Sequence, residues 1–431
     1  MDRLSQRWIV ADEARSGGKT ALAAALRASR ERTLALSDCY ASTLGSAMRV
    51  PNTPQFNPPL WELGHVGWFQ EYWLRRNAQS LRGIDGEPDD PRLPSLLAHA
   101  DSLYDSSNVA HDSRWELPLL DAGKTRAYLD AVLDSTLDLL RASDEDDRSL
   151  YFFRLVLMHE EMHGEAAVYS AQALGVPVSG SLRSASPATP EAPATQITAT
   201  GRPALRGSSA ARTLRFDACD WELGSRGAGF AFDNELVAQR LPVPEFEIDE
   251  RPVRWRDYLE FVDAHGYDDP QWWSPEGWTD IQSRPSRLPR YVRRSATSSA
   301  GFGWQCQRFG AWQSLDPDAP AVHLNHFEAQ AWCRWAGRVL PTEAQWERAA
   351  MSHADFSWGE VWEWTASTFD PYPGFVAHPY RDYSAPWFGT RPVLRGAGQG
   401  TTARMTHPKY RNFFTPERND IHAGFRSCRH A

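Results

Sequence analysis

Residues 151–175 read YFFRLVLMHEEMHGEAAVYSAQALG, and this stretch decides the fold of the N-terminal half of the chain. Apolar residues run through it at helical spacing, and Gly175 with Pro177 behind it forms a normal helix end. Within it, His159 and His163 are four residues apart, so both imidazoles project from the same face of a helix. The stretch therefore predicts a long helix that presents two neighbouring histidines as candidate metal ligands.

Three further helices are predicted upstream of this one. Helical periodicity places the four helices at Ala21–Leu44, Leu60–Asn77, Lys124–Ala142 and Arg148–Leu174. Such segments predict a four-helix bundle with a longer crossover between the second helix and the third. His65 lies in the middle of the second helix among apolar residues, and a bundle directs ligands from facing helices into its interior. We therefore expect His65 to join His159 and His163 around one ion, although a lone interior histidine is more often a hydrogen-bonded core residue.

The composition changes after the fourth helix. The segment after Val178 (SGSLRSASPATPEAPATQ) is rich in Ser, Ala, Thr and Pro and cannot build a core. The sequence thus predicts a helical bundle over residues 1–177, a flexible linker over 178–212, and an α+β domain rich in turns over 213–431. In the last part, two helices are expected near Arg254–Ala264 and Asn325–Ala336.

Composition and charge exclude several classes of protein. The 431 residues carry a net charge of −9 with acidic and basic residues interspersed, which argues against binding to nucleic acids or to an anionic membrane surface. No signal peptide is evident, and no stretch approaches the ~20 apolar residues that span a bilayer. The five cysteines are scattered without CxxC pairing, which is typical of free thiols in a reducing cytoplasm. We expect a cytoplasmic protein that acts on small molecules; the sequence does not determine its oligomeric state.

Three histidines from two facing helices would leave part of a metal ion's coordination shell open, as in the iron oxygenases. Imidazole suits zinc as well as iron, so the ligands alone do not choose the metal. HEEMH (residues 159–163) also matches the H-E-x-x-H pattern of zinc hydrolases, in which Glu160 would be the general base. Another alternative is a binding module without catalytic activity, whose second half holds a betaine or a glycan.

Both halves of the chain resemble known families. NPPLWELGHVGWFQEYWLR (residues 57–75) followed by HEEMH resembles the N-terminal, DinB-like four-helix bundle of the ergothioneine-biosynthesis sulfoxide synthases. FDNE (232–235), IDERPV (248–253), LPTEAQWERAA (340–350) and GEVWEWT (359–365), with VLRGAG and AGFRSC, resemble the formylglycine-generating-enzyme or sulfatase-modifying-factor domain, which is C-type-lectin-like and α+β. Formylglycine generation itself is not expected, because GQGTTARMTHPKYRN lacks the cysteine pair on which that activity relies.

The resemblance implies an activity and a cofactor. It implies non-haem Fe(II) on His65, His159 and His163, and O2-dependent formation of a carbon–sulfur or carbon–selenium bond at C2 of the imidazole of hercynine, the trimethylated betaine of histidine. The active site is then expected where the bundle meets the second domain. The catalytic tyrosine of the family should lie in VAHPYRDYSAPWFG, with Tyr383 as first choice and Tyr380 as second.

The substrate contacts implied by the resemblance carry over unevenly. On the hercynine side, Asn412 matches the family's asparagine, Phe413 stands at its usual tryptophan position, and Met162 replaces a glutamine. On the side of the chalcogen donor, Arg114 and Arg418 match two arginines, whereas His111 replaces an arginine and Phe414 an aspartate.

With His111 in place of an arginine and Phe414 in place of an aspartate, the donor site lacks one cation and one anion. These charges would pair with the carboxylate and the ammonium group of an amino-acid donor. A neutral donor fits better, such as a sugar that bears a thiol or a selenol. NPPLWELGH and HEEMHGE most resemble the selenoneine synthases, a branch of the family that uses a selenosugar, and this resemblance makes a selenoneine synthase the first expectation. The alternative is an ergothioneine sulfoxide synthase that uses γ-glutamylcysteine or cysteine.

Overall fold

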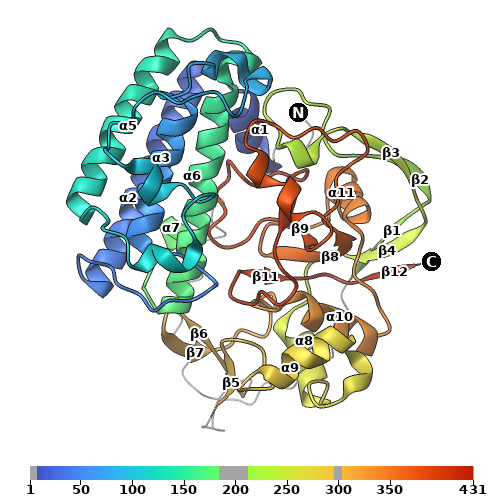
Figure 1. Cartoon of the computed structure of the whole chain (residues 1–431). Helices are drawn as coiled ribbons and strands as arrows, with labels where there is room; N and C mark the ends of the chain where they lie inside the picture. Colours follow the sequence, from blue (N-terminus) through green and yellow to red (C-terminus); the bar gives the residue numbers. More distant parts are fainter. Residues whose placement is uncertain (1–6, 184–211, 296–302, 431) are drawn as a thin grey trace.

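Four long helices pack side by side in the N-terminal half of the computed structural model, which describes residues 7–183, 212–295 and 303–430 (Figure 1). The helices of this half are α1 (Ile9–Ser16), α2 (Lys19–Leu44), α3 (Pro59–Trp73), α4 (Ala100–Tyr104), α5 (Ala122–Ala142), α6 (Asp147–Leu174) and α7 (Gly180–Arg183), with the short 3-10 helices η2 (Ser80–Asp85) and η3 (His111–Trp115). In the bundle, α2 and α3 each neighbour both α5 and α6. The four predicted helices are confirmed to within four residues at each end, whereas α1 and the short helices of the crossover were not predicted.

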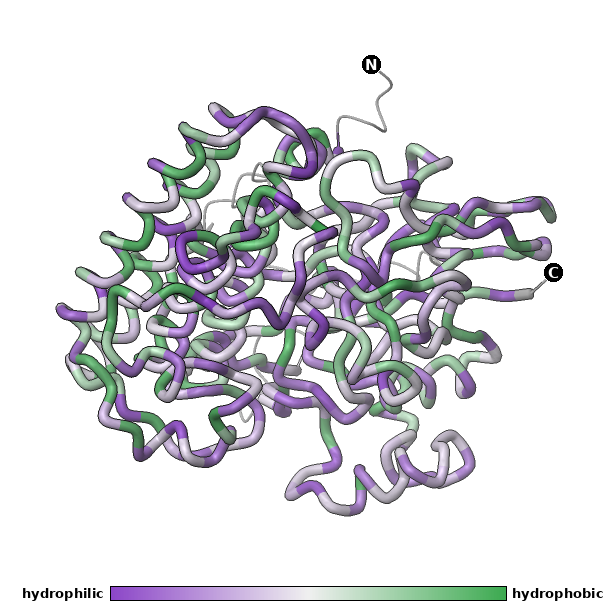
Figure 2. Tube along the Cα trace, turned by 45° about the horizontal axis from the view of Figure 1, so that its top comes forward, coloured by the Kyte–Doolittle hydropathy of each residue, from purple (hydrophilic) through white to green (hydrophobic). Residues whose placement is uncertain are grey.

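Local sequence explains where these helices begin and end. The Asp121 and Asp146 side chains accept hydrogen bonds from backbone N–H groups in the first turns of α5 and α6, and Gly175 ends α6 with φ 71°. Pro59 occupies the first turn of α3, where a missing N–H costs nothing. Helix α3 is buried on nearly all sides, which fits its run of apolar residues. Figure 2 shows the bundle helices alternating between hydrophobic and hydrophilic turns.

The C-terminal half combines short strands, helices and long irregular connections. Its helices are α8 (Trp255–Asp263), α9 (Pro275–Ser283), α10 (His326–Trp335) and α11 (Glu343–Ser352), with η4 (Asp233–Glu235), η5 (Pro270–Trp272), η6 (Arg381–Tyr383) and η7 (Ala385–Trp387). Its strands are β1 (Thr213–Phe216), β2 (Cys219–Leu223), β3 (Gln239–Val243), β4 (Phe246–Asp249), β5 (Val292–Arg294), β6 (Trp304–Arg308), β7 (Ala311–Ser314), β8 (Trp362–Thr368), β9 (Pro392–Gly396), β10 (Asn412–Phe413), β11 (Ala423–Gly424) and β12 (Cys428–His430). The predicted helices near residues 254–264 and 325–336 are confirmed as α8 and α10.

Four small sheets organise these strands. The central one has the order β10-β9-β8-β11, in which β8 and β9 are antiparallel and β11 runs parallel to β8. The others have the orders β1-β4-β12, β2-β3 and β5-β6-β7. In Figure 1 the central sheet lies between the bundle and the β1-β4-β12 sheet. Helix α11 was not predicted as a helix, although Thr342 and Gln345 form a capping box at its start.

Helix α6 joins the two halves. Its side chains pack into the bundle on one side, and on the other they meet loops of the C-terminal domain. The Tyr151 hydroxyl lies 3.0 Å from Nδ1 of His378, and the Thr401 hydroxyl donates to Glu165 at 2.8 Å. The largest apolar core contains residues of both halves, from Leu26 and Trp68 to Trp364 and Phe425. The two halves therefore share one buried interior in which residues of both can line a site.

The predicted linker falls only partly within the described residues. Val178 is buried against the bundle and the next residues form α7, whereas residues 184–211 lie outside the described part of the chain. Among the described helices, none is long and apolar enough to cross a membrane.

Candidate metal centre

Three histidine side chains converge in the interior of the bundle. His65 comes from α3, and His159 and His163 come from α6. Each offers a ring nitrogen, and these three atoms lie within 4.8 Å of one another. The Nε2 atoms of His159 and His163 are 3.1 Å apart, a spacing that two ligands of one ion with metal–nitrogen bonds of about 2.1 Å can adopt. In residues 7–183, 212–295 and 303–430, no other group of three His, Cys, Asp or Glu side chains converges in this way.

The outer edges of these rings are held by the protein. Nδ1 of His65 donates to the backbone carbonyl of Tyr104 at 2.7 Å, and Nδ1 of His163 donates to the Glu62 carboxylate. The His159 ring lies flat on Phe69, with ring centroids 3.5 Å apart and planes within 4°. Metal-bound histidines typically make such outer contacts, because they fix the tautomer and leave the inner nitrogen free to ligate.

Burial keeps two of the three histidines neutral. It lowers the pKa of His65 to about 3, and it lowers the pKa of His159 well below the ordinary value. Burial alone would raise the pKa of Glu62, but the charge and hydrogen bond of His163 lower it to about 2. The imidazoles of His65 and His159 are therefore neutral near pH 7, as ligation of a divalent cation requires, and the Glu62 carboxylate is charged. The site fits a transition metal that favours imidazole, iron or zinc among them.

Glu160 does not face these histidines. Its carboxylate accepts hydrogen bonds from Nε of Arg30 at 2.9 Å and from Nη2 at 3.2 Å. Both side chains are 2% exposed. Arg30 also donates to the side chain of Gln70 and to the carbonyl of Leu129. A general base must reach the water that the metal binds. The expectation that Glu160 could serve a zinc hydrolase is thus not supported by the direction of its side chain.

The two candidate tyrosines lie differently. The Tyr380 ring packs edge-on against Phe69, with centroids 4.9 Å apart, and its centroid is 6.3 Å from that of His159. The Tyr383 hydroxyl lies 3.1 Å from the Tyr410 hydroxyl, and its ring packs on Phe232. Burial raises the pKa of Tyr380, and raises that of Tyr383 well above its ordinary value. Both hydroxyls therefore keep their protons at neutral pH.

Of the residues assigned to hercynine, Met162 lies on α6, and Asn412 and Phe413 form β10. The Tyr410 hydroxyl donates to the sulfur of Met162 at 3.4 Å, which joins the bundle to the C-terminal domain. Phe413 stacks on Phe369 with ring centroids 4.0 Å apart, and its centroid is 5.8 Å from that of Tyr383. The Asn412 side chain accepts a hydrogen bond from the backbone N–H of Phe413. Tyr410 was missed by sequence reasoning, because nothing local distinguishes it from a core tyrosine.

The two arginines assigned to the donor are already paired within the protein. Arg114 is buried and makes four hydrogen bonds. Three go to the backbone carbonyls of Ser106 and Val109, and one goes to the side chain of Asn57. Arg418 donates to both oxygens of Asp420, at 2.6 and 2.7 Å, and lies over the rings of Phe414 and Tyr169.

His111 begins η3, the short helix that also contains Arg114. It packs against Trp115, and its Nδ1 lies 3.3 Å from the exposed Asp112 carboxylate.

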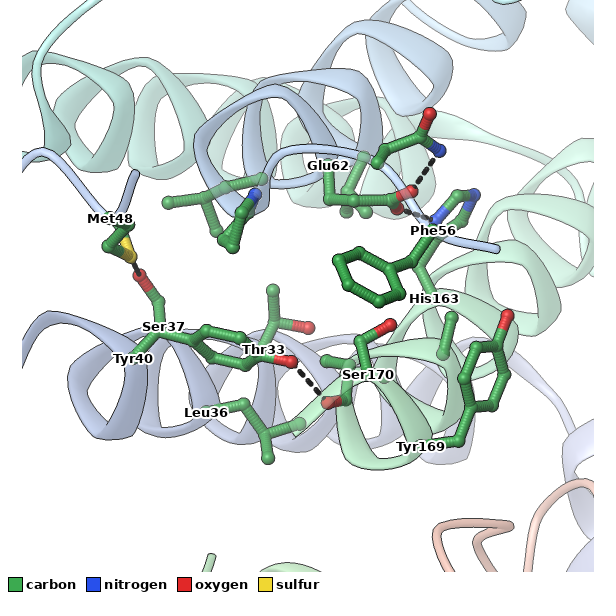
Figure 3. A pocket seen from close by; sticks show the side chains of 17 residues that line it. Thr33, Leu36, Ser37, Tyr40, Met48, Phe56, Glu62, His163, Tyr169 and Ser170 are labelled. Carbon is green, nitrogen blue, oxygen red and sulfur yellow. Dashed lines mark hydrogen bonds and ion pairs between the residues drawn. The ribbon is translucent and has the colours of Figure 1, made fainter. Parts of the chain in front are cut away.

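A small cavity of about 70 Å³ lies between α2, α3 and α6, with His163 in its wall. In Figure 3, Glu62, Phe56 and His163 lie at one end, whereas Ser37 and Met48 lie at the other. Sequence reasoning also missed Glu62. It precedes His65 by three residues on α3, and that helical spacing was the available signal.

Comparison with known proteins extends over both halves. Residues 25–167 match the DinB superfamily, and residues 206–360 and 354–431 match the sulfatase-modifying factor enzyme 1-like domain. These matches confirm the expected order of a DinB-like bundle followed by an α+β domain.

Several curated relatives are similar to the chain. A hercynine oxygenase of Mycolicibacterium smegmatis is 32% identical over 94% of this chain and 97% of the relative. One of Mycobacterium tuberculosis is 31% identical over 94% of this chain and 97% of that relative. A formylglycine-generating enzyme of Streptomyces coelicolor is 24% identical over 56% of this chain and 96% of that enzyme. With the match to the hercynine oxygenases spanning the bundle, the three histidines and the C-terminal domain alike, the chain belongs to the hercynine oxygenase family.

Proposed function

We propose that this protein is an iron(II)-dependent oxidoreductase that uses O2 to join the sulfur of a thiol to the imidazole of hercynine, giving a sulfoxide. The observation that carries the proposal is the convergence of three imidazoles beside the C-terminal domain, in a chain that belongs to the hercynine oxygenase family. Iron(II) held by His65, His159 and His163 would supply the redox chemistry that couples O2 to carbon–sulfur bond formation.

The overall reaction balances with one O2. The C2–H bond of hercynine and the S–H bond of the thiol break, and a C–S bond and an S=O bond form. One oxygen atom enters the sulfoxide and the other leaves as water with the two hydrogens. Oxygen accepts four electrons, two from formation of the C–S bond and two from oxidation of the sulfur. The reaction needs no other oxidant or reductant.

The side chains around the histidines have separate tasks in this proposal. The Tyr380 hydroxyl, protonated because it is buried beside His159, holds a proton that it can deliver to reduced oxygen. The aromatic face of Phe413 suits a trimethylammonium group. The buried rings of Trp61 and Phe69, which stack on His65 and His159, limit access of bulk water to the reacting groups.

A second candidate differs only in the donor. The relatives that match nearly the whole chain are hercynine oxygenases, which favours the sulfur reaction as first choice over selenium. A neutral donor such as a selenosugar is nevertheless favoured by one observation, the pairing of Arg114 with Asn57 and of Arg418 with Asp420. Arginines with internal partners cannot take up the carboxylates of an amino-acid donor without breaking those bonds.

Anaerobic reconstitution tests both candidates. The protein is loaded with Fe(II), supplied with hercynine and a panel of donors (γ-glutamylcysteine, cysteine, a thiosugar and a selenosugar), and then exposed to O2. Mass spectrometry of the products and oxygen consumption are the readouts. We expect an O2-dependent hercynine adduct whose mass identifies the donor. Absence of an adduct and of oxygen uptake with every donor would refute the proposed function.

A further inference from the structure

Glu62 is held at both carboxylate oxygens. Its Oε2 accepts from Nδ1 of His163, and its Oε1 accepts from the side-chain amide of Asn57. The carboxylate also lines the cavity beside the histidines, so one of its sides borders open space (Figure 3). A carboxylate in that position can turn away from His163 unless its second oxygen is fixed. The amide of Asn57 provides that second attachment.

Arg114 in turn fixes Asn57. Its Nη1 donates to the Asn57 side-chain oxygen at 2.7 Å, so the amide is forced to offer its N–H groups to Glu62. Its Nη2 donates to the backbone carbonyls of Ser106 and Val109 at 3.1 and 3.0 Å, and its Nε donates to the latter at 3.3 Å. All three guanidinium nitrogens therefore have partners in the protein, and the side chain is buried.

Arg114 reaches His65 as well. The guanidinium carbon lies 3.9 Å from the centroid of the Trp61 ring. That ring stacks on the imidazole of His65, with centroids 4.8 Å apart and planes within 9°. The crossover forms two further hydrogen bonds with this stacked pair of Trp61 and His65. Leu103 accepts the indole N–H of Trp61 through its carbonyl at 2.7 Å, and the Tyr104 carbonyl accepts Nδ1–H of His65.

We infer that Arg114 is a positioning residue of the metal centre, which acts on His163 through Asn57 and Glu62 and on His65 through Trp61, rather than a residue that binds the chalcogen donor. This inference rests on the proposed function in one respect, that the three histidines hold a metal. Outer hydrogen-bond partners of metal ligands contribute about 10–100-fold to metal affinity. The structure assigns such a contribution to a residue that the family resemblance would place on the substrate.

Metal affinity tests the inference without turnover. Apoprotein is titrated with Co(II), and separately with Fe(II) under anaerobic conditions, in competition with a chelator, and the visible spectrum of bound Co(II) is recorded. The variants are Arg114→Met, Asn57→Ala, Glu62→Ala and the conservative Glu62→Gln. Arg154→Met is the matched control. Arg154 is also a buried arginine of the bundle, but its partners are Asp147 and the Gly17 carbonyl, which do not contact the histidines.

We expect the Kd for Co(II) to rise about 10–100-fold in Glu62→Ala and at least several-fold in Arg114→Met and Asn57→Ala, with a changed Co(II) spectrum. Glu62→Gln should recover part of the loss, since an amide oxygen can still accept from His163. Arg154→Met should bind Co(II) like the unmodified protein.

Two results separate the possible failures. If the unmodified protein takes up no metal, the proposed function fails. If it does bind, and Arg114→Met keeps the Kd within twofold while raising KM for the donor, the positioning role is wrong and Arg114 is a donor contact. Should Arg114→Met not fold, Asn57→Ala carries the same test, because Asn57 lies between Arg114 and Glu62, and a Kd within twofold of that of the unmodified protein would refute the positioning role.

Discussion

Loss of the Arg30–Glu160 pair should destabilise the bundle without removing the metal site. The pair links α2 to α6 through two hydrogen bonds, and each side chain is 2% exposed. Glu160→Gln keeps the shape of the side chain but leaves the guanidinium of Arg30 buried without a counter-charge. Breaking one partner of such a buried pair costs about 3–5 kcal/mol. At about 2–4 °C per kcal/mol for a domain of this size, Tm should fall by roughly 6–20 °C.

The assay is thermal and urea unfolding followed by the helical circular-dichroism signal, with bound Co(II) per folded chain measured in parallel. Arg30→Met should cost a similar amount, and the double variant Arg30→Met/Glu160→Met should lose much less than the sum, since no buried charge is left unpaired. A zinc hydrolase predicts the opposite pattern, in which Glu160→Gln retains stability and abolishes a metal-dependent hydrolysis. Unchanged stability in Glu160→Gln would refute the structural role.

Three further predictions concern catalysis, donor choice and pH. Tyr380→Phe should lower kcat by about 10²–10⁴-fold with little change in the hercynine KM, whereas Tyr383→Phe should have a smaller effect; the reverse order in steady-state kinetics would assign the proton to Tyr383. Phe414→Asp should shift donor preference towards amino-acid thiols, because it restores an anion for their ammonium group, and competition between γ-glutamylcysteine and a thiosugar, read by mass spectrometry, measures the shift. Burial lowers the pKa of His326 to about 4, so the unfolded chain binds a proton that the folded one excludes, and stability should fall by up to about 1.4 kcal/mol per unit as the pH drops from 6.5 to 4. His326→Gln should remove the part of that slope that His326 contributes, and an unchanged slope would contradict the prediction.

Sequence determined the parts of this protein that depend on short-range patterns. Helical periodicity and end signals such as Asp146 and Gly175 fix where a helix begins and ends, because they act within one or two turns. The spacing of His159 and His163 likewise places both imidazoles on one face, whatever the rest of the chain does. The motifs that carry the family resemblance predicted the order of the two domains, and the family matches confirm that order.

The tertiary structure alone decided which partner each polar side chain has. Nothing in HEEMH shows that Glu160 points to Arg30, since that partner is 130 residues away on another helix. Similarly, the hydrogen bond from Arg114 to Asn57 depends on how the crossover folds back. The ion pair between Arg418 and Asp420 depends on the fold of the connection between β10 and β11. Periodicity predicts which face of a helix or strand is buried, but it does not identify the charged side chain that packs against that face. The choice between metal ligand, ion pair and substrate contact is made by packing.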